Sequence, residues 1–297
     1  MRQPSPRIGA LLDPSILESA QEGEGGLQTI GLESFSLSFW ESLGGRDVEA
    51  LAGEMFARFG LRPSCLSVYG NPLAEGEGGA RFRSDLERLM ECAPRLGCRL
   101  VSTFAGRVPG ASVPDSMERF RGIFAPLCER AAALGVSIAF ENCRFGDTWK
   151  SGKWNIAMNP DAWELIFAAL PGAPIGLEWE PAHQILALAD PLVQLGEWLP
   201  RILHIHAKDA RVDRDLLASR GMVGPRKIGE ERLAGEGEAD WKKIMTMLIE
   251  AEWRGSVDVE IGATPGWGGD RSFEGISRAI ANLRRARAAA GEARLPG

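Results

Sequence analysis

Histidine is scarce in this chain, and long apolar stretches are missing altogether. Only three histidines occur in 297 residues, at His183, His204 and His206. No run approaches the roughly 18 apolar residues that a membrane-spanning helix needs. The first residues also lack the apolar core and small-residue cleavage site of a signal peptide. We therefore expect no membrane partner and no secretion of the protein.

Basic clusters and closely spaced cysteine pairs are also absent. The formal net charge is −6, and no group of Lys and Arg residues is large enough to suggest a nucleic-acid surface. The five cysteines include no Cys-x-x-Cys pair, and their odd number argues against a disulfide framework. Free thiols are typical of the reducing cytoplasm. We therefore expect a cytoplasmic protein with free, mostly buried cysteines and no nucleic-acid partner.

Short apolar runs alternate along the chain with amphipathic segments of helical length. In residues 47–60 and 116–135, for example, hydrophobic residues recur at three- and four-residue spacing. Eight apolar runs, each followed by such a segment, predict a single (β/α)8 TIM barrel in which residues 1–297 form one domain. A doubly wound open sheet would need a Gly-x-Gly-x-x-Gly turn, which is missing. The expected strands are residues 7–12, 28–34, 64–70, 99–105, 136–142, 174–180, 202–208 and 256–262.

Polar residues interrupt the apolar pattern at the carboxyl ends of four consecutive predicted strands. These residues are Glu141, Glu178, Glu180, His183, His204, His206 and Glu260. The carboxyl ends of neighbouring barrel strands lie side by side, so these side chains should converge on one face. Buried carboxylates repel one another and are costly to remove from water. A divalent cation among them would offset both costs.

The residue types indicate which ion would fit. Three carboxylates and one neutral imidazole suit Mn²⁺ or Mg²⁺, and the histidine also allows Co²⁺ or Zn²⁺. We expect Glu141, Glu180, His206 and Glu260 to be the ligands. A single Glu at a strand end is more often a salt-bridge partner, and one of two histidines at i and i+2 is expected to be structural. The convergence of four strands favours the metal site over these simpler explanations.

Five motifs carry a resemblance to a known family. They are "FEN" at 140–142, "EPAH" at 180–183, "HIHAKD" at 204–209, "RLAGEGEADWKKI" at 232–244 and "VDVEIG" at 257–262. They resemble motifs of the xylose-isomerase-like TIM-barrel superfamily of sugar-phosphate isomerases and epimerases, whose members include ketose 3-epimerases and inosose dehydratase. The resemblance implies the same four metal ligands. It also implies that His183 contacts the substrate and that Arg232 clamps a hydroxyl or phosphate. The family usually has Asp where this chain has Glu180, so Glu178 is the alternative ligand.

The expected chemistry is proton transfer next to the carbonyl of a small carbohydrate. Glu141 and Glu260 would act as base and acid on an enediolate, which suits an isomerase or epimerase. Loss of a β-hydroxyl would instead give a lyase or dehydratase, and a non-catalytic sugar-binding or partner subunit is a third possibility. Trp154, in a loop that could close over the substrate, and Lys208, paired with Asp209, are expected beside the sugar. The resemblance alone suggests a homo-oligomer.

Overall fold

Eight parallel strands close into a barrel in the computed structural model, which describes residues 5–14, 30–262, 264–266 and 271–292. In chain order they are β1 (Arg7–Leu12), β2 (Ser34–Trp40), β3 (Pro63–Tyr69), β4 (Leu100–Thr103), β5 (Ser137–Glu141), β6 (Ile175–Trp179), β7 (Ile202–Val212) and β9 (Ser256–Val259). Strand β9 pairs in parallel with both β7 and β1 and so completes the ring. The predicted TIM barrel is therefore confirmed.

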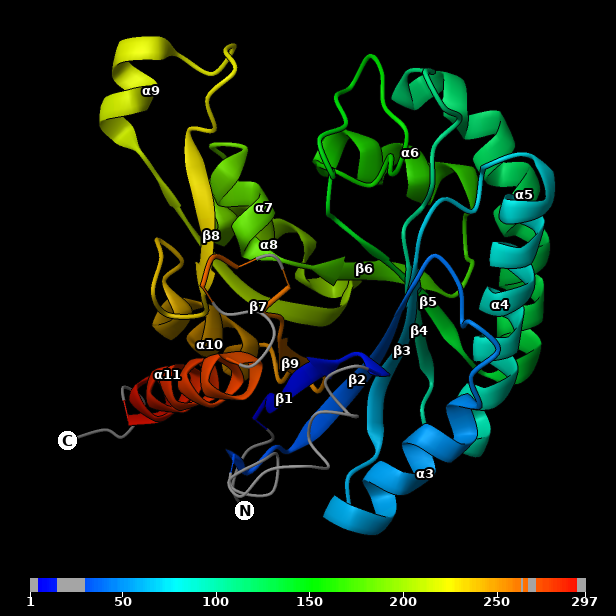
Figure 1. Cartoon of the computed structure of the whole chain (residues 1–297), viewed down its shortest axis with the longest axis horizontal. Helices are drawn as coiled ribbons and strands as arrows, with labels where there is room; N and C mark the ends of the chain where they lie inside the picture. The colour runs from blue at the N-terminus through cyan, green and yellow to red at the C-terminus, as the bar shows by residue number, and fades with distance from the viewer. Residues whose placement is uncertain (1–4, 15–29, 263, 267–270, 293–297) are drawn as a thin grey trace.

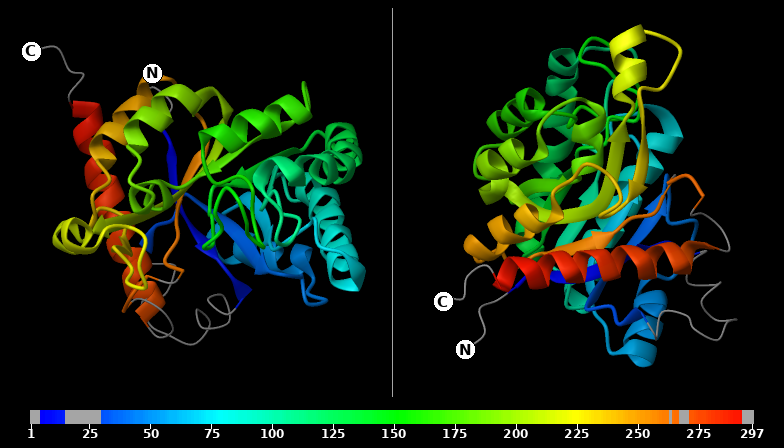
Figure 2. Two further views of the ribbon diagram at one scale, coloured as in Figure 1. Left: turned by 90° about the horizontal axis from the view of Figure 1, so that it is seen from above. Right: turned by 90° about the vertical axis from the view of Figure 1, so that its left-hand side faces the viewer.

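Helices lie around the outside of the barrel (Figures 1 and 2). They are α3 (Val48–Phe59), α4 (Gly76–Arg95), α5 (Val113–Leu134), α6 (Pro160–Ala169), α7 (Pro181–Leu186), α8 (Pro191–Trp198), α9 (Arg214–Arg220), α10 (Trp241–Glu250) and α11 (Ser272–Glu292), with a short 3-10 turn η1 (Leu199–Arg201). Helix α5 ends at Gly135, whose φ of 65° is the left-handed conformation that favours glycine. None of the described helices is long and apolar enough to cross a membrane.

The strand prediction is wrong at the second position. Residues 28–34 were expected to be a strand, but β2 begins only at Ser34, and residues 30–33 form no strand. The actual strand reads SFSLSFW, in which serine alternates with apolar residues. Ser34, Ser36 and Ser38 are buried. A search for apolar runs passes over such a segment, because every second residue at its start is a serine.

A ninth strand, β8 (Gly229–Leu233), was not predicted. It pairs antiparallel with the second half of β7, so that Lys208 lies opposite Leu233 and Val212 opposite Gly229. Helix α9 connects the two strands and stands away from the barrel at the upper left of Figure 1. The hairpin therefore extends β7 beyond the end of the barrel, on the side where the polar strand ends lie.

Close approach of strands inside the barrel requires glycine at one position of β1. A Cβ atom on Gly9 would lie 2.3 Å from Oδ1 of Asp258 and 2.4 Å from the carbonyl oxygen of Ser34. The interior is thus filled by polar as well as apolar side chains. All five cysteines are buried and free, as their number and spacing predicted.

Candidate functional site

Four side chains at the carboxyl ends of β5, β6, β7 and β9 converge. They are Glu141, Glu180, His206 and Glu260, here called the acidic cluster. Each residue offers one atom that could bind a metal, a carboxylate oxygen or a ring nitrogen, and these four atoms all lie within 4.8 Å of one another. These are the four residues that the sequence predicts as metal ligands, and the alternative ligand, Glu178, is not in the group.

The acidic cluster contains carboxylate oxygens that the protein does not satisfy. Both oxygens of Glu180 and Oε2 of Glu260 are buried and accept no well-formed hydrogen bond within the described residues. The nearest ring nitrogens, those of His183 and His206, lie 3.2 Å from Oε2 of Glu180 and Oε2 of Glu260. An unpaired buried acceptor is costly, and more so when it carries charge. A divalent cation with oxygen ligands would satisfy these atoms. The residues present therefore fit a metal ion.

The ring of His206 presents one nitrogen to the acidic cluster and the other to a buried carboxylate. Its Nδ1 lies 2.9 Å from Oε1 of Glu141 and 3.2 Å from Oε2 of Glu260. Its Nε2 lies 3.1 Å from Oε1 of Glu178. With the proton on Nε2 donated to Glu178, the lone pair of Nδ1 is free to bind a cation. Carboxylates commonly orient metal-binding histidines in this way.

A buried polar network lies behind His206. Its members, here called the inner network, are Tyr69, Ser102, Glu178, His204 and Asp258. The hydroxyl of Tyr69 donates to Oε2 of Glu178 at 2.5 Å, and that of Ser102 donates to the same oxygen. Nδ1 of His204 lies 2.7 Å from Glu178, and Nε2 lies 2.9 Å from Asp258. Since both neighbours are acceptors, His204 can donate from both ring nitrogens when it is protonated. These contacts fit the structural role that the sequence predicts for one of the two histidines.

Burial and charge shift the pKa values in opposite directions across the site. Burial raises the pKa of Glu141, although a hydrogen bond from His206 opposes the shift. Burial would also raise the pKa of Glu178, but the charge of His206 and hydrogen bonds from His204 and His206 lower it. Burial would lower the pKa of His206, but Glu178 and the other carboxylates raise it well above its ordinary range. The site therefore favours positive charge among its carboxylates.

Lys208 and Asp209 do not form the expected ion pair. Successive residues of a strand face opposite sides, and Lys208 faces the acidic cluster. Its Nζ donates to Oε1 of Glu260 at 2.7 Å and lies 3.6 Å from Oε1 of Glu180. The carboxylate of Asp209 instead accepts from the backbone amides of Ala210, Gly235 and Ala239 and from the indole of Trp241. It orders the segment that leads into α10.

Two further residues lie beside the acidic cluster. His183, near the start of α7, places Nε2 3.2 Å from Oε2 of Glu180, and its side chain is 12% exposed. Glu231, on β8, places Oε2 3.8 Å from Nζ of Lys208. That oxygen is buried and has no hydrogen-bond partner within the described structure. The structure thus brings His183 and Lys208, both predicted to contact substrate, to the cluster, and it adds Glu231.

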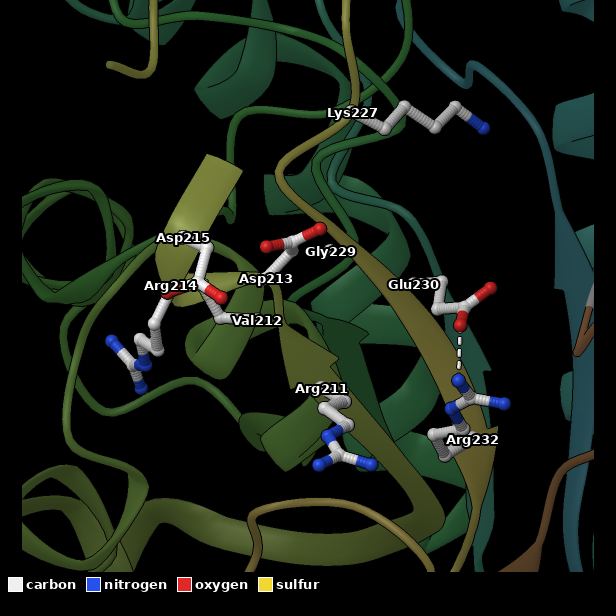
Figure 3. Close-up of a pocket in the computed structure, with 9 residues that line it drawn as sticks. All are labelled: Arg211, Val212, Asp213, Arg214, Asp215, Lys227, Gly229, Glu230 and Arg232. Atoms are coloured by element: carbon white, nitrogen blue, oxygen red, sulfur yellow. Dashed lines mark hydrogen bonds and ion pairs between the residues drawn. The ribbon is translucent and has the colours of Figure 1, made fainter. Parts of the chain in front are cut away.

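The side chain of Arg232 makes no contact with the acidic cluster among the described residues. Its guanidinium pairs with Glu230 (Figure 3). By strand alternation it faces away from the side of β8 that carries Glu231. Both residues of the pair line a separate pocket of about 610 Å³, together with Arg211, Val212, Asp213, Arg214, Asp215, Lys227 and Gly229. A role for Arg232 in substrate binding stays a prediction from the resemblance.

Trp154 belongs to a group of aromatic rings formed by the end of β2 and the loop after β5. Its ring centroid lies 5.7 Å from that of Trp40 and 5.4 Å from that of Phe145. Trp40 is 49% exposed and Phe145 is 50% exposed. Contacts from Trp40 to Phe104 and from Phe104 to Tyr69 connect this group with the inner network. The ring of Tyr69 lies 6.2 Å from that of His206, so a chain of ring contacts joins the exposed aromatic residues to the acidic cluster.

The loop after β5 is tied down by buried polar contacts. Arg107, which is fully buried, donates to the carbonyl oxygens of Ala111, Thr148 and Trp149. The carboxylate of Asp147 accepts from the backbone amides of Lys153, Trp154 and Asn155. These bonds anchor the loop in the conformation that the structure shows, and closure of the loop over a substrate stays a prediction.

Sequence reasoning missed four residues of the site, namely Tyr69, Ser102, Asp258 and Glu231. Tyr69 is the only tyrosine of the chain, which could have marked it as unusual. Asp258 precedes Glu260 by two positions and therefore shares its strand face. Glu231 carries no signal in the sequence, because only the hairpin pairing brings it to Lys208.

Comparison with known proteins gives one family and several relatives. The model of the xylose isomerase-like TIM barrel family matches residues 26–286. YfiH, an uncharacterized protein of Bacillus subtilis (strain 168), is 26% identical over 228 residues, which cover 66% of this chain and 70% of YfiH. An inosose dehydratase of Clostridium tetani (strain Massachusetts / E88) is 28% identical over 92 residues, covering 30% of this chain and 31% of that enzyme.

Solved structures share the fold at low sequence identity. That of L-ribulose 3-epimerase is similar with a TM-score of 0.67 and 17% identity, and the match covers 98% of both chains. At this identity the similarity shows the barrel alone. Other structures with the same fold include further epimerases and a probable dehydratase.

Proposed function

Because the chain belongs to the xylose isomerase-like TIM barrel family, we propose that it is a divalent-metal-dependent isomerase or epimerase of a small carbohydrate. The observation that carries this proposal is the acidic cluster, with its unpaired buried oxygens. Similarity to epimerases in fold and to an inosose dehydratase over part of the chain supports it.

Glu141, Glu180, His206 and Glu260 would hold the ion. Bound Mn²⁺ or Mg²⁺, with Co²⁺ or Zn²⁺ as alternatives, would polarise a substrate carbonyl and stabilise the negative charge that develops when the neighbouring carbon loses a proton. Lys208 donates to Oε1 of Glu260, which leaves Oε2 facing the cluster. Hydrogen bonding to Glu178 fixes the His206 ring in the same way.

Glu141 and Glu260 would transfer the protons. They come from β5 and β9, and His206 lies between them. One carboxylate would remove the proton from the carbon next to the carbonyl, and the other would return a proton to the opposite face or to the adjacent carbon. Burial raises the pKa of Glu141. Burial opposes the shift at Glu260, but Lys208 and His206 hold its pKa well below the ordinary range.

Three residues would contact the sugar. His183 and Lys208 each lie within hydrogen-bonding range of one cluster carboxylate and carry donors for substrate hydroxyl groups. Trp154 and its aromatic neighbours would pack against the apolar face of a ring. The substrate would therefore extend from the acidic cluster toward Trp154 and its aromatic neighbours.

A metal-dependent lyase or dehydratase is the second candidate. The match to inosose dehydratase favours it, as does an ammonium group beside the acidic cluster. After the carbon-bound proton has left, a hydroxyl on the next carbon would depart with a proton from a neighbouring donor, giving water. The product would then contain a new double bond instead of an inverted centre.

The test combines metal analysis with product analysis. Purified protein should contain or bind about one Mn²⁺ per chain, and His206→Ala should bind at least tenfold more weakly. Glu164→Gln, on the exposed side of α6, is the control and should bind normally. Proton NMR of a panel of keto-sugars and inososes would separate epimerisation from loss of water. A wild-type protein that binds no divalent ion would contradict both candidates.

A further inference from the structure

Glu231 has a buried carboxylate oxygen that the proposed metal site does not explain. Its side chain as a whole is 21% exposed. It lies on β8, and its carboxylate oxygens are not part of the acidic cluster. Its Oε2 is buried without a hydrogen-bond partner in the described part of the chain. Burying such an acceptor unpaired is costly, and more so when the group is charged. A ligand that donates to this oxygen would remove that cost.

Lys208, the cation next to Glu231, also has unused hydrogen-bonding capacity. An ammonium group has three N–H donors. One donates to Oε1 of Glu260 at 2.7 Å. The distances from Nζ to Glu180 and Glu231, 3.6 Å and 3.8 Å, exceed the normal length of a hydrogen bond. An unpaired acceptor thus lies beside a donor that is not saturated.

A hydroxyl group matches this arrangement. It accepts one hydrogen bond and donates another, each about 2.8 Å long. Two such bonds can bridge atoms that are 3.8 Å apart, as Nζ of Lys208 and Oε2 of Glu231 are. Neither a carbonyl, which only accepts, nor a methyl group would satisfy both partners.

We propose that Lys208 and Glu231 together bind one hydroxyl group of the substrate, with Lys208 donating and Glu231 accepting. Glu231 is then a specificity-determining residue that selects carbohydrates with a hydroxyl at this position. The inference rests on the proposed function of the acidic cluster, because that cluster holds the reacting end of the substrate. Since Lys208 is also bonded to Glu260, the selected hydroxyl lies close to the reacting carbons.

A purely structural role for Glu231 makes a different prediction. If Glu231 served only as a counter-ion, its loss would disturb Lys208, then Glu260, and then metal binding. Mn²⁺ affinity therefore separates the two roles. Glu231→Gln keeps the size of the side chain and removes its charge, and Glu231→Ala removes the acceptor. Glu230→Gln, a 49% exposed neighbour on the other face of β8, is the matched control.

The experiment measures Mn²⁺ binding by calorimetry, and kcat/KM for L-ribulose, or the ketose of the panel with the highest turnover, and for its monodeoxy analogues. In Glu231→Gln and Glu231→Ala, Mn²⁺ affinity should stay within twofold of wild type. The preference for the full ketose over one particular deoxy analogue should fall at least tenfold. Glu230→Gln should change neither quantity.

Two results would overturn the inference. One is a parallel loss of Mn²⁺ affinity and turnover with unchanged discrimination, which would assign Glu231 a structural role. The other is that the Glu231 variants keep both the turnover of wild type and its preference for the full ketose over every deoxy analogue. A wild-type protein that fails to bind Mn²⁺ would instead remove the proposed function, so the two failures are distinguishable.

Discussion

Nε2 of His206 lies 3.1 Å from Oε1 of Glu178, on the side of the ring that faces away from the acidic cluster. Glu178 is itself held by Tyr69 from β3 and by Ser102 from β4. Strands that contribute no residue to the acidic cluster therefore fix the orientation of its only imidazole. The inner network is the means by which the barrel sets the geometry of the site.

Glu178→Gln tests this dependence. A neutral amide would leave His204 with a weaker acceptor and would no longer favour the proton on Nε2 of His206. We expect Mn²⁺ affinity to fall about 10- to 100-fold, measured by calorimetry on protein whose circular dichroism spectrum matches wild type. Glu129→Gln, on the exposed surface of α5, should bind Mn²⁺ as wild type does. Equal affinity in the Glu178 variant would show that His206 is oriented by other contacts.

Gly9→Ala should destabilise the barrel strongly. The new Cβ would meet Oδ1 of Asp258 at 2.3 Å and the carbonyl oxygen of Ser34 at 2.4 Å, both inside the closed sheet. We expect a loss of about 1–3 kcal/mol or more in the free energy of unfolding, measured in urea. Gly53→Ala is the matched substitution, because its Cβ meets nothing within 4 Å on α3. It should stabilise the protein by about 0.5–1 kcal/mol. Similar stability of the two variants would contradict the close approach.

Arg107→Met should release the loop after β5. The substitution leaves the carbonyl oxygens of Thr148 and Trp149 without their donor. We expect hydrogen exchange across residues 147–156 to accelerate at least tenfold while β5 stays protected. Arg130→Met, which changes a 52% exposed side chain on α5, should leave the exchange pattern unchanged. Rapid hydrogen exchange of residues 147–156 in the wild-type protein would instead show that this loop is mobile.

Glu33 and Arg287 should make stability depend on pH. Burial would raise the pKa of Glu33, but hydrogen bonds from Arg287 and from the Ile8 amide lower it below 4.5. A lowered pKa in the folded state adds stability above the unfolded pKa, and this stability is lost as the pH falls through the folded pKa. Because the pair is partly exposed, we expect Glu33→Gln to cost about 1 kcal/mol or less at pH 7.

Urea unfolding at several pH values measures this contribution. The difference between wild type and Glu33→Gln should shrink as the pH falls below about 4.5, the ordinary pKa of Glu33. A difference that stays constant from pH 7 to pH 3 would mean that the ion pair contributes nothing. Glu164→Gln should be as stable as wild type at every pH.

Local sequence patterns were sufficient for most of the barrel. Seven of the eight predicted strands coincide closely with strands of the barrel, and the eighth shares only Ser34 with β2. The helices predicted at 47–60 and 116–135 overlap α3 and α5. Strand β2 was missed because its inward face is serine, so its alternation resembles a polar surface segment. The acidic cluster could be predicted because its residues interrupt apolar strands at a shared end, and parallel strands bring those ends to one face.

The sequence by itself determined the fold class and which strand ends supply the acidic cluster, since both depend on periodicity and chain order. It could not determine whether Glu178 or Glu180 joins the cluster, because residues two apart on a strand share one face and differ only in depth. Interstrand register decides that depth, and it pairs Glu178 with His204 inside the barrel. The position of Glu231 also depends on tertiary structure, because an antiparallel pairing, which no local pattern encodes, carries it to Lys208.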